Sequence, residues 1–176
     1  YIQRNSVAVA ESTIRDDLGI SQKQMGWALS AFFLTYAIFQ LPSGWLGDRW
    51  GARLSLTMYS GLWSLSAACL LIVAGPIGLI NTRLAMGAAQ AGIFPASTKA
   101  LSAWIPGTWR GLATGTLASS MSIGGVIAAA STGNIIALVG WQWTFLIFAL
   151  PGLLWTAVFY LWFRDRPQDH HSVNEA

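Results

Sequence analysis

Two long apolar stretches flank a short cationic segment, and this arrangement limits the folds open to the chain. The stretches cover residues 25–46 and 54–74, and each is long enough to cross a bilayer, which takes about 20 residues. The connecting segment 44–53, GWLGDRWGAR, holds three glycines, one aspartate and two arginines. A short, cationic, glycine-rich connection between two membrane spans is typical of a tight cytoplasmic hairpin.

The glycines and the charged residues of this connection each have an expected role. Gly44, Gly47 and Gly51 are expected to allow positive φ in the turn and close approach of the helices. The Asp48 carboxylate is suited to backbone N–H groups at a helix start. The guanidinium groups of Arg49 and Arg53 are suited to helix C-termini or lipid phosphates.

The composition also indicates a membrane protein. Hydrophobic residues make up 54% of the 176 residues and charged residues only 10%, whereas ordinary globular proteins carry about 25% charged residues. The net charge of +3 does not indicate a nucleic-acid partner, because Lys and Arg are scattered along the chain rather than clustered. We find no motif for a metal site or for a nucleophile with its base, so we expect no metal, no cofactor and no enzyme.

The apolar segments predict an all-α membrane protein with six transmembrane helices. We expect them at residues 1–14, 25–46, 54–74, 77–103, 112–138 and 143–163. The first starts at Tyr1 without a preceding basic leader, and we interpret it as the trailing part of a longer helix. Residues 1–163 would then form one bundle in a lipid bilayer. Residues 164–176 would form a polar, frayed cytoplasmic tail.

The distribution of basic residues predicts the orientation of the bundle. Five arginines belong to one side of the membrane, namely Arg49, Arg53, Arg110, Arg164 and Arg166. The opposite side has only Arg15 and Lys23. This excess places the C-terminus of the segment in the cytoplasm by the positive-inside rule. Lys99, near the same end, is expected to reach the interface or to attract anions at the inner mouth.

Two arginines lie inside apolar segments. Neither Arg4 nor Arg83 has an obvious acidic partner, and for Arg83 the usual ion-pair explanation is removed because no Asp or Glu occurs between Asp48 and Asp165. A charge within the bilayer is costly and persists where it faces a cavity or a partner. Guanidinium groups bind carboxylate or phosphate through two parallel hydrogen bonds, so this pair is suited to an anionic ligand. The alternative, in which one of them snorkels to a lipid headgroup, stays open.

Several motifs resemble known transporters. The pattern G-x-L-G-D-R-x-G-x-R at residues 44–53 resembles the loop 2–3 motif of the major facilitator superfamily. Residues 1–4 and 83–95 are similar to the Y-x-D-R and R-x-x-x-G-x-x-E-A-x-x-F-P elements of the anion:cation symporter family within it. Residues 104–115 and 140–165 match further elements of that family. The resemblance implies the N-terminal six-helix half of a twelve-helix transporter, whose substrate sits near the midplane between two halves.

The resemblance also implies roles for single residues. Arg4 and Arg83 become carboxylate-binding candidates, and Tyr1 and Tyr36 match tyrosines that line the cavity, although Tyr36 is also interpretable as a core residue. Members of the family carry sugar acids, aromatic carboxylates and other organic anions. The loop motif, through Gly44, Asp48, Arg49, Gly51 and Arg53, would latch the cytoplasmic side. The missing partner is the C-terminal six-helix half.

Three positions depart from the family pattern. Gln3 and Gln90 stand where proton-coupled members often have Asp and Glu, and an amide cannot titrate. Either substrate binding is retained while proton coupling is lost or moved, or the amides are equally good polar contacts and the coupling acids lie in the other half. Met121 replaces a Gln of some sugar-acid carriers, which favours a less hydroxylated or aromatic carboxylate.

Glu11 is a candidate substitute for the missing acids. It lies seven residues after Arg4, almost two helical turns, and so on the same helix face. It is also interpretable as a solvated charge at a helix end. The favoured function is secondary transport of a small organic anion across the plasma (inner) membrane, coupled to a proton or cation. The alternative is a non-transporting membrane sensor or a decayed half-transporter.

Overall fold

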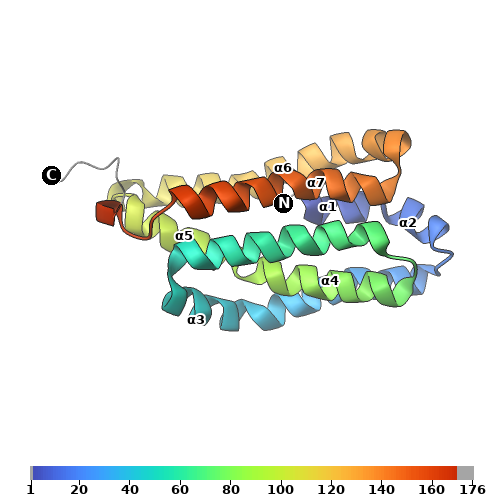
Figure 1. Ribbon diagram of the computed structural model, residues 1–176, viewed down its shortest axis with the longest axis horizontal. Helices are drawn as coiled ribbons and strands as arrows, with labels where there is room; N and C mark the ends of the chain where they lie inside the picture. The colour runs from blue at the N-terminus through green and yellow to red at the C-terminus, as the bar shows by residue number, and fades with distance from the viewer. Residues whose placement is uncertain (1, 170–176) are drawn as a thin grey trace.

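The structure is a computed structural model in which residues 2–169 are described. The chain forms a bundle of helices that lie along the long axis of the molecule (Figure 1). In chain order the elements are α1 (Ile2–Val9), α2 (Glu11–Asp17), α3 (Gln22–Ala68), η1 (Cys69–Ile72), α4 (Pro76–Ala91), α5 (Ile93–Trp104), η2 (Gly107–Trp109), α6 (Arg110–Val139), α7 (Trp141–Trp162) and η3 (Pro167–Asp169). The all-α fold class is therefore as predicted.

The second and third predicted spans are the two legs of α3. The chain reverses at Gly51, whose φ of 83° and ψ of 167° are not helical, and the legs cover residues 22–50 and 52–68. The expected loop over residues 44–53 is wrong, since the helix continues through Trp50 and the turn is made at Gly51. Gly44 and Gly47 are helical, and the positive φ expected of them occurs only at Gly51. A glycine suits this position because side chains with a Cβ rarely adopt such a φ.

The first and fourth predicted spans are each broken into two helices. The break between α4 and α5 falls at Gly92, three residues before Pro95. Proline has no N–H to donate to the carbonyl of Ala91, so the hydrogen-bond ladder stops there. By length and apolar composition, the stretches able to cross a membrane within residues 2–169 are 22–72, 107–139 and 141–162.

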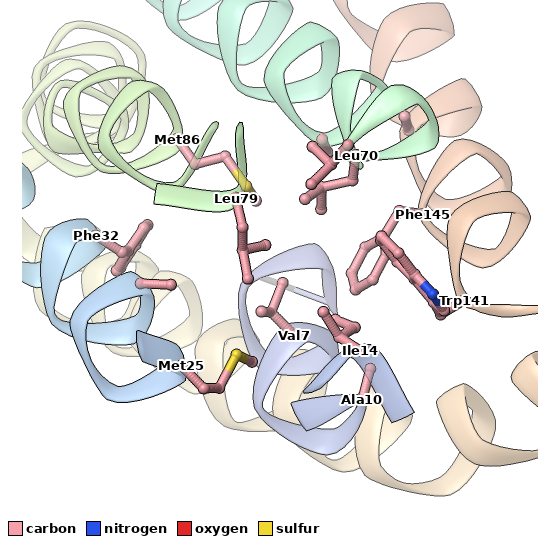
Figure 2. Close-up of a cluster of buried hydrophobic side chains, with 14 of the residues drawn as sticks. Val7, Ala10, Ile14, Met25, Phe32, Leu70, Leu79, Met86, Trp141 and Phe145 are labelled. Atoms are coloured by element: carbon pink, nitrogen blue, oxygen red, sulfur yellow. The ribbon is translucent and has the colours of Figure 1, made fainter. Parts of the chain in front are cut away.

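The core is built around the N-terminal helices. Val7 and Ile14, from α1 and α2, are fully buried among side chains of the legs of α3, α4 and α7 (Figure 2). Phe32 and Met86 extend this cluster on one side, and Phe145 extends it on the other. The outward faces carry large exposed apolar side chains, such as Leu41 and Leu138. A chain that is apolar on its outside is suited to a lipid environment.

α6 packs against α1 through small residues. Gly124, Ala128 and Thr132 are buried on this face. The Thr132 hydroxyl donates to the Ser6 hydroxyl at 2.9 Å, in a fully buried contact. Helices in lipid associate through such surfaces because small side chains let backbones approach closely. This contact holds α1 in place and therefore positions Arg4, which precedes Ser6 by half a turn.

Candidate functional site

Arg83 is a buried cation that pairs with no carboxylate in the part of the chain that the structure describes. It lies on α4 and is only 2% exposed, and its Nε and Nη1 atoms have no hydrogen-bond partner. The ion pairs formed within residues 2–169 involve Arg15 and Lys99 rather than Arg83. Leaving a buried guanidinium unpaired costs several kcal/mol. Ionisable groups inside a membrane are retained where they face the bundle interior, a cavity or a partner.

Arg4 lies on α1, beside aromatic side chains of the first leg of α3. Its guanidinium carbon is 5.3 Å from the ring centroid of Phe32, 5.4 Å from that of Phe33 and 5.7 Å from that of Tyr36. Arg4 is half-buried, in contrast to Arg83. Tyr36 is therefore a neighbour of Arg4, and it also packs against the hydrophobic core. Tyr1 lies outside the described residues.

The two arginines share one aromatic ring. The guanidinium carbon of Arg83 is 4.6 Å from the Phe32 centroid, so it cannot be farther from that of Arg4 than the two distances combined, about 10 Å. The structure thus brings together two residues that are 79 positions apart in the chain. Phe32 was not singled out in the sequence. Its spacing of four residues from Tyr36 was the available signal, because residues four apart share a helix face.

The remaining candidates occupy two different cavities. Arg4 and Met121 line an open cavity of about 340 Å³ together with Asn5, Ser122 and Gly125. Gln3 and Gln90 line a separate cavity of about 540 Å³, between α1, the second leg of α3, the helices α4 and α5, and α7. The substrate-binding residues predicted from the sequence therefore do not all face one space. Arg83 lines neither of these two cavities, and the neighbour that it shares with Arg4 is the Phe32 ring.

Both amides carry an unsatisfied oxygen. The Gln3 Nε2 group donates to the Phe148 carbonyl at 2.6 Å, which directs Oε1 away from that carbonyl. Oε1 of Gln3 and Oε1 of Gln90 are buried and accept no hydrogen bond. A buried acceptor without a donor is unfavourable. A carboxyl group at either position could bind and release a proton, which an amide cannot do.

Glu11 forms an ion pair at the opposite end from the turn at Gly51. Its carboxylate lies 3.4 Å from the Arg15 guanidinium, one turn along α2, and both side chains are 31% exposed. Arg15 also contacts Asp16. Glu11 begins α2 rather than continuing α1, since the helix is interrupted at Ala10.

The turn at Gly51 is held by Asp165, which follows α7. The Asp165 Oδ1 atom accepts a hydrogen bond from the Arg53 backbone N–H at 2.8 Å. A methyl group at Gly51 would lie 2.7 Å from Asp165 Oδ2. The Arg53 guanidinium donates to the Tyr160 carbonyl near the end of α7 and covers the Tyr160 ring. The prediction that Arg53 meets a helix C-terminus is confirmed. The expectation of a frayed tail from residue 164 is wrong at its start, because Asp165 is tied to the turn.

Lys99 on α5 closes the other side of the same turn. Its ammonium group donates to the carbonyls of Gly47 and Asp48 at 3.0 Å each, and lies 3.3 Å from the Asp48 carboxylate. The Asp48 side chain is 80% exposed and does not bind the helix start as predicted, since Asp165 does so. Lys99 thus binds a helix C-terminus and Asp165 a helix N-terminus, which matches the sign of each helix dipole. The carbonyl contacts of Lys99 were not anticipated from the sequence.

Asp165→Ala is expected to lower the free energy of unfolding by about 1–2 kcal/mol, because the Arg53 N–H loses its acceptor at the start of a helix. Thermal unfolding of the full-length protein in detergent measures the change. Asp169→Ala, in the same segment but exposed, is the matched control and should leave the melting temperature unchanged. Equal melting temperatures for both variants would contradict a structural role for Asp165.

Comparison with known proteins agrees with this geometry. The whole chain, residues 1–176, matches the family profile of the Major Facilitator Superfamily. The chain belongs to this superfamily. The assignment confirms the predicted superfamily, and it agrees with a transport protein rather than an enzyme embedded in the membrane.

Individual relatives add detail. The chain is 31% identical over 173 residues to a probable sulfoacetate transporter of Cupriavidus necator. The alignment covers 98% of this chain and 40% of the relative. The chain is 30% identical over 176 residues to a hexuronate transporter of Bacillus subtilis, with 100% and 41% coverage. A crystal structure of a bacterial homologue of the human lysosomal transporter Spinster, inward-facing and unoccupied, has the same fold. Its TM-score is 0.80 at 23% identity, over 94% of this chain and 40% of that chain.

The chain spans about 40% of the length of these relatives. This share agrees with the prediction that the chain corresponds to one half of a major facilitator fold.

Proposed function

We propose that this chain forms the N-terminal half of a secondary transporter for a small organic anion. The observation that carries the proposal is the pair Arg4 and Arg83, two guanidinium groups that share the Phe32 ring and contact no carboxylate among residues 2–169. A carboxylate bound to them supplies the missing negative charge through charge-assisted hydrogen bonds. Relatives named for hexuronate and for sulfoacetate, both carboxylates, support this substrate class.

The proposed mechanism is alternating access. Residues 1–163 form the bundle, and the segment from residue 164 leads to a second six-helix half that completes the binding site. Rocking of the halves exposes the bound anion to each side in turn. The clamp of Lys99 and Asp165 around Gly51 rigidifies the turn, which supports a latching role for the motif of Gly44, Asp48, Arg49, Gly51 and Arg53. The five-to-two excess of arginines supports a cytoplasmic location for this end in the inner membrane.

Gln3 and Gln90 bear on the coupling. They are buried, cannot bind a proton at accessible pH, and have no acid beside them in their cavity. The proposal is that substrate binding in this half does not involve proton uptake at these two positions. Glu11 is the candidate acid, and its ion pair with Arg15 gives it a second, structural role. Met121, which lines the cavity of Arg4, supports a substrate with few hydroxyl groups.

Uptake by the full-length protein in proteoliposomes tests the proposal. We expect uptake of labelled sulfoacetate to exceed that of labelled glucuronate, because the Met121 thioether offers no hydrogen bond to a sugar hydroxyl. Because Gln3 and Gln90 cannot titrate, a pH gradient should change uptake only through an acid at another position. Empty liposomes provide the control. Uptake of neither acid, together with normal folding, would contradict transport and favour a membrane sensor. Strong stimulation by an inward proton gradient would place the coupling acid elsewhere, and uptake of Glu11→Gln then decides whether it is Glu11.

A further inference from the structure

We propose that Phe32 is a positioning residue of the anion site, which holds the two guanidinium groups through the face of its ring. This inference rests on the proposed function and adds a residue to it. Phe32 is fully buried on the first leg of α3. Its ring centroid lies 4.6 Å from the guanidinium carbon of Arg83 and 5.3 Å from that of Arg4. The electron-rich face of an aromatic ring attracts a cation at such distances.

The ring takes the place that a carboxylate occupies in an ordinary buried ion pair. An acid beside Arg83 would hold the N–H groups of its guanidinium fork and would compete with an anionic substrate for them. The face of an aromatic ring attracts the charge but accepts no hydrogen bond from the N–H groups that lie in the guanidinium plane. Accordingly, Nε and Nη1 of Arg83 have no partner, although the residue is 2% exposed. No acceptor within residues 2–169 therefore occupies these donors, and the two like charges lie close together at one ring.

Three neighbouring aromatic side chains hold the Phe32 ring in position. Phe33 packs on it edge to face at 5.2 Å, Trp63 does so at 6.0 Å, and Tyr36 stacks at 6.1 Å between centroids. The first leg of α3 is also hydrogen-bonded to α4 next to Phe32, because the Thr35 hydroxyl donates to the Leu84 carbonyl at 2.9 Å. A rigid ring between α1 and α4 limits how far the half-buried Arg4 can move from Arg83. Preorganisation of this kind lowers the cost of binding.

Fluorinated phenylalanines at position 32 test the role of the ring without changing its shape. Fluorine withdraws electrons from the ring face, so we expect the affinity for a carboxylate to fall stepwise with one, two and three fluorines. The total loss should be about 3- to 30-fold, the range that a cation–π contact supports. The measurement is the dissociation constant of sulfoacetate for the full-length protein in detergent. The same series at Phe145, equally buried and packed on Trp141, should leave the dissociation constant unchanged.

Two further outcomes separate the hypotheses. A flat or rising affinity across the series at position 32, with normal binding by the wild type, overturns the role of Phe32 and leaves the proposed function intact. Failure of the wild type to bind any carboxylate overturns the proposed function first, and this inference with it. Phe32→Leu and Phe145→Leu give a second check: both should reduce thermal stability, and only the first should weaken binding.

Discussion

Arg83→Met is expected to reduce carboxylate binding by at least about 100-fold and, at the same time, to raise the thermal stability of the protein. Binding falls because the anion loses a guanidinium fork in a buried site, and truncating one partner of such a contact costs 2–5 kcal/mol. Stability rises because the substrate-free protein no longer buries an unpaired cation whose Nε and Nη1 atoms lack partners. The side chain of Met fills a similar volume, so that no large cavity forms.

The dissociation constant of a labelled carboxylate and the melting temperature without ligand measure the two effects together. Arg83→Lys retains the charge and loses the planar fork, so it should bind with intermediate affinity. Arg15→Met removes a half-buried arginine that already has acidic partners, and it should leave binding unchanged. Normal binding by Arg83→Met would refute the site. A melting temperature below that of the wild type would show that the contact of Arg83 with Phe32 outweighs the cost of burying the unpaired cation, and would contradict the expected gain in stability.

Gly87→Ala is expected to disrupt the packing of α4 against the first leg of α3 and to lower the free energy of unfolding by about 3 kcal/mol or more. An added methyl group would overlap the Phe32 carbonyl oxygen and the Thr35 hydroxyl. Neither can move freely, because the first is backbone and the second donates across the helices to Leu84. Overpacking of a tight contact costs 1–3 kcal/mol, and occasionally more when the backbone has to shift.

Yield of folded full-length protein and its melting temperature measure this effect. Gly26→Ala is the matched control. Gly26 lies on the first leg of α3, against which Gly87 of α4 packs, and no atom lies within 4 Å of the added methyl group. It should be neutral or stabilising by up to about 1 kcal/mol, since alanine is the better helix former. Because Gly87 lies one turn from Arg83, any Gly87→Ala protein that folds should also bind carboxylate more weakly. Unchanged stability would mean that the two helices are farther apart than described.

Much of the architecture was predictable because the signals are local. Apolar runs of about 20 residues depend only on the cost of exposing polar groups to lipid, and they place most of the helices correctly. The single-residue turn was less predictable. Segment 44–53 contains three glycines, but only Gly51 has a positive φ. The break at Gly92 depends on Pro95, and the extent to which a proline interrupts a helix depends on its neighbours.

The site followed the same division. Arg4 and Arg83 were identifiable from the sequence, because a charge in an apolar span with no acid nearby requires an explanation wherever the helices lie. The contacts of Phe32, Lys99 and Asp165 were not identifiable from the sequence. Each of these residues acts on a residue more than 25 positions away, through contacts that exist only after the helices pack. The separation of Gln3 and Gln90 from the cavity of Arg4 is also a result of packing, since side chains on one helix point into different spaces.

From its sequence alone, then, this protein is predicted to be an all-helical membrane chain with two arginines inside apolar segments, since both features follow from the free energy of placing residues in lipid. Only the tertiary structure decided that these cations meet at one aromatic ring, and that an aspartate beyond the last long helix completes a turn 114 residues earlier. The reason is that a hydrophobic pattern specifies which residues avoid water, whereas helix packing through small residues and single hydrogen bonds decides which of them touch.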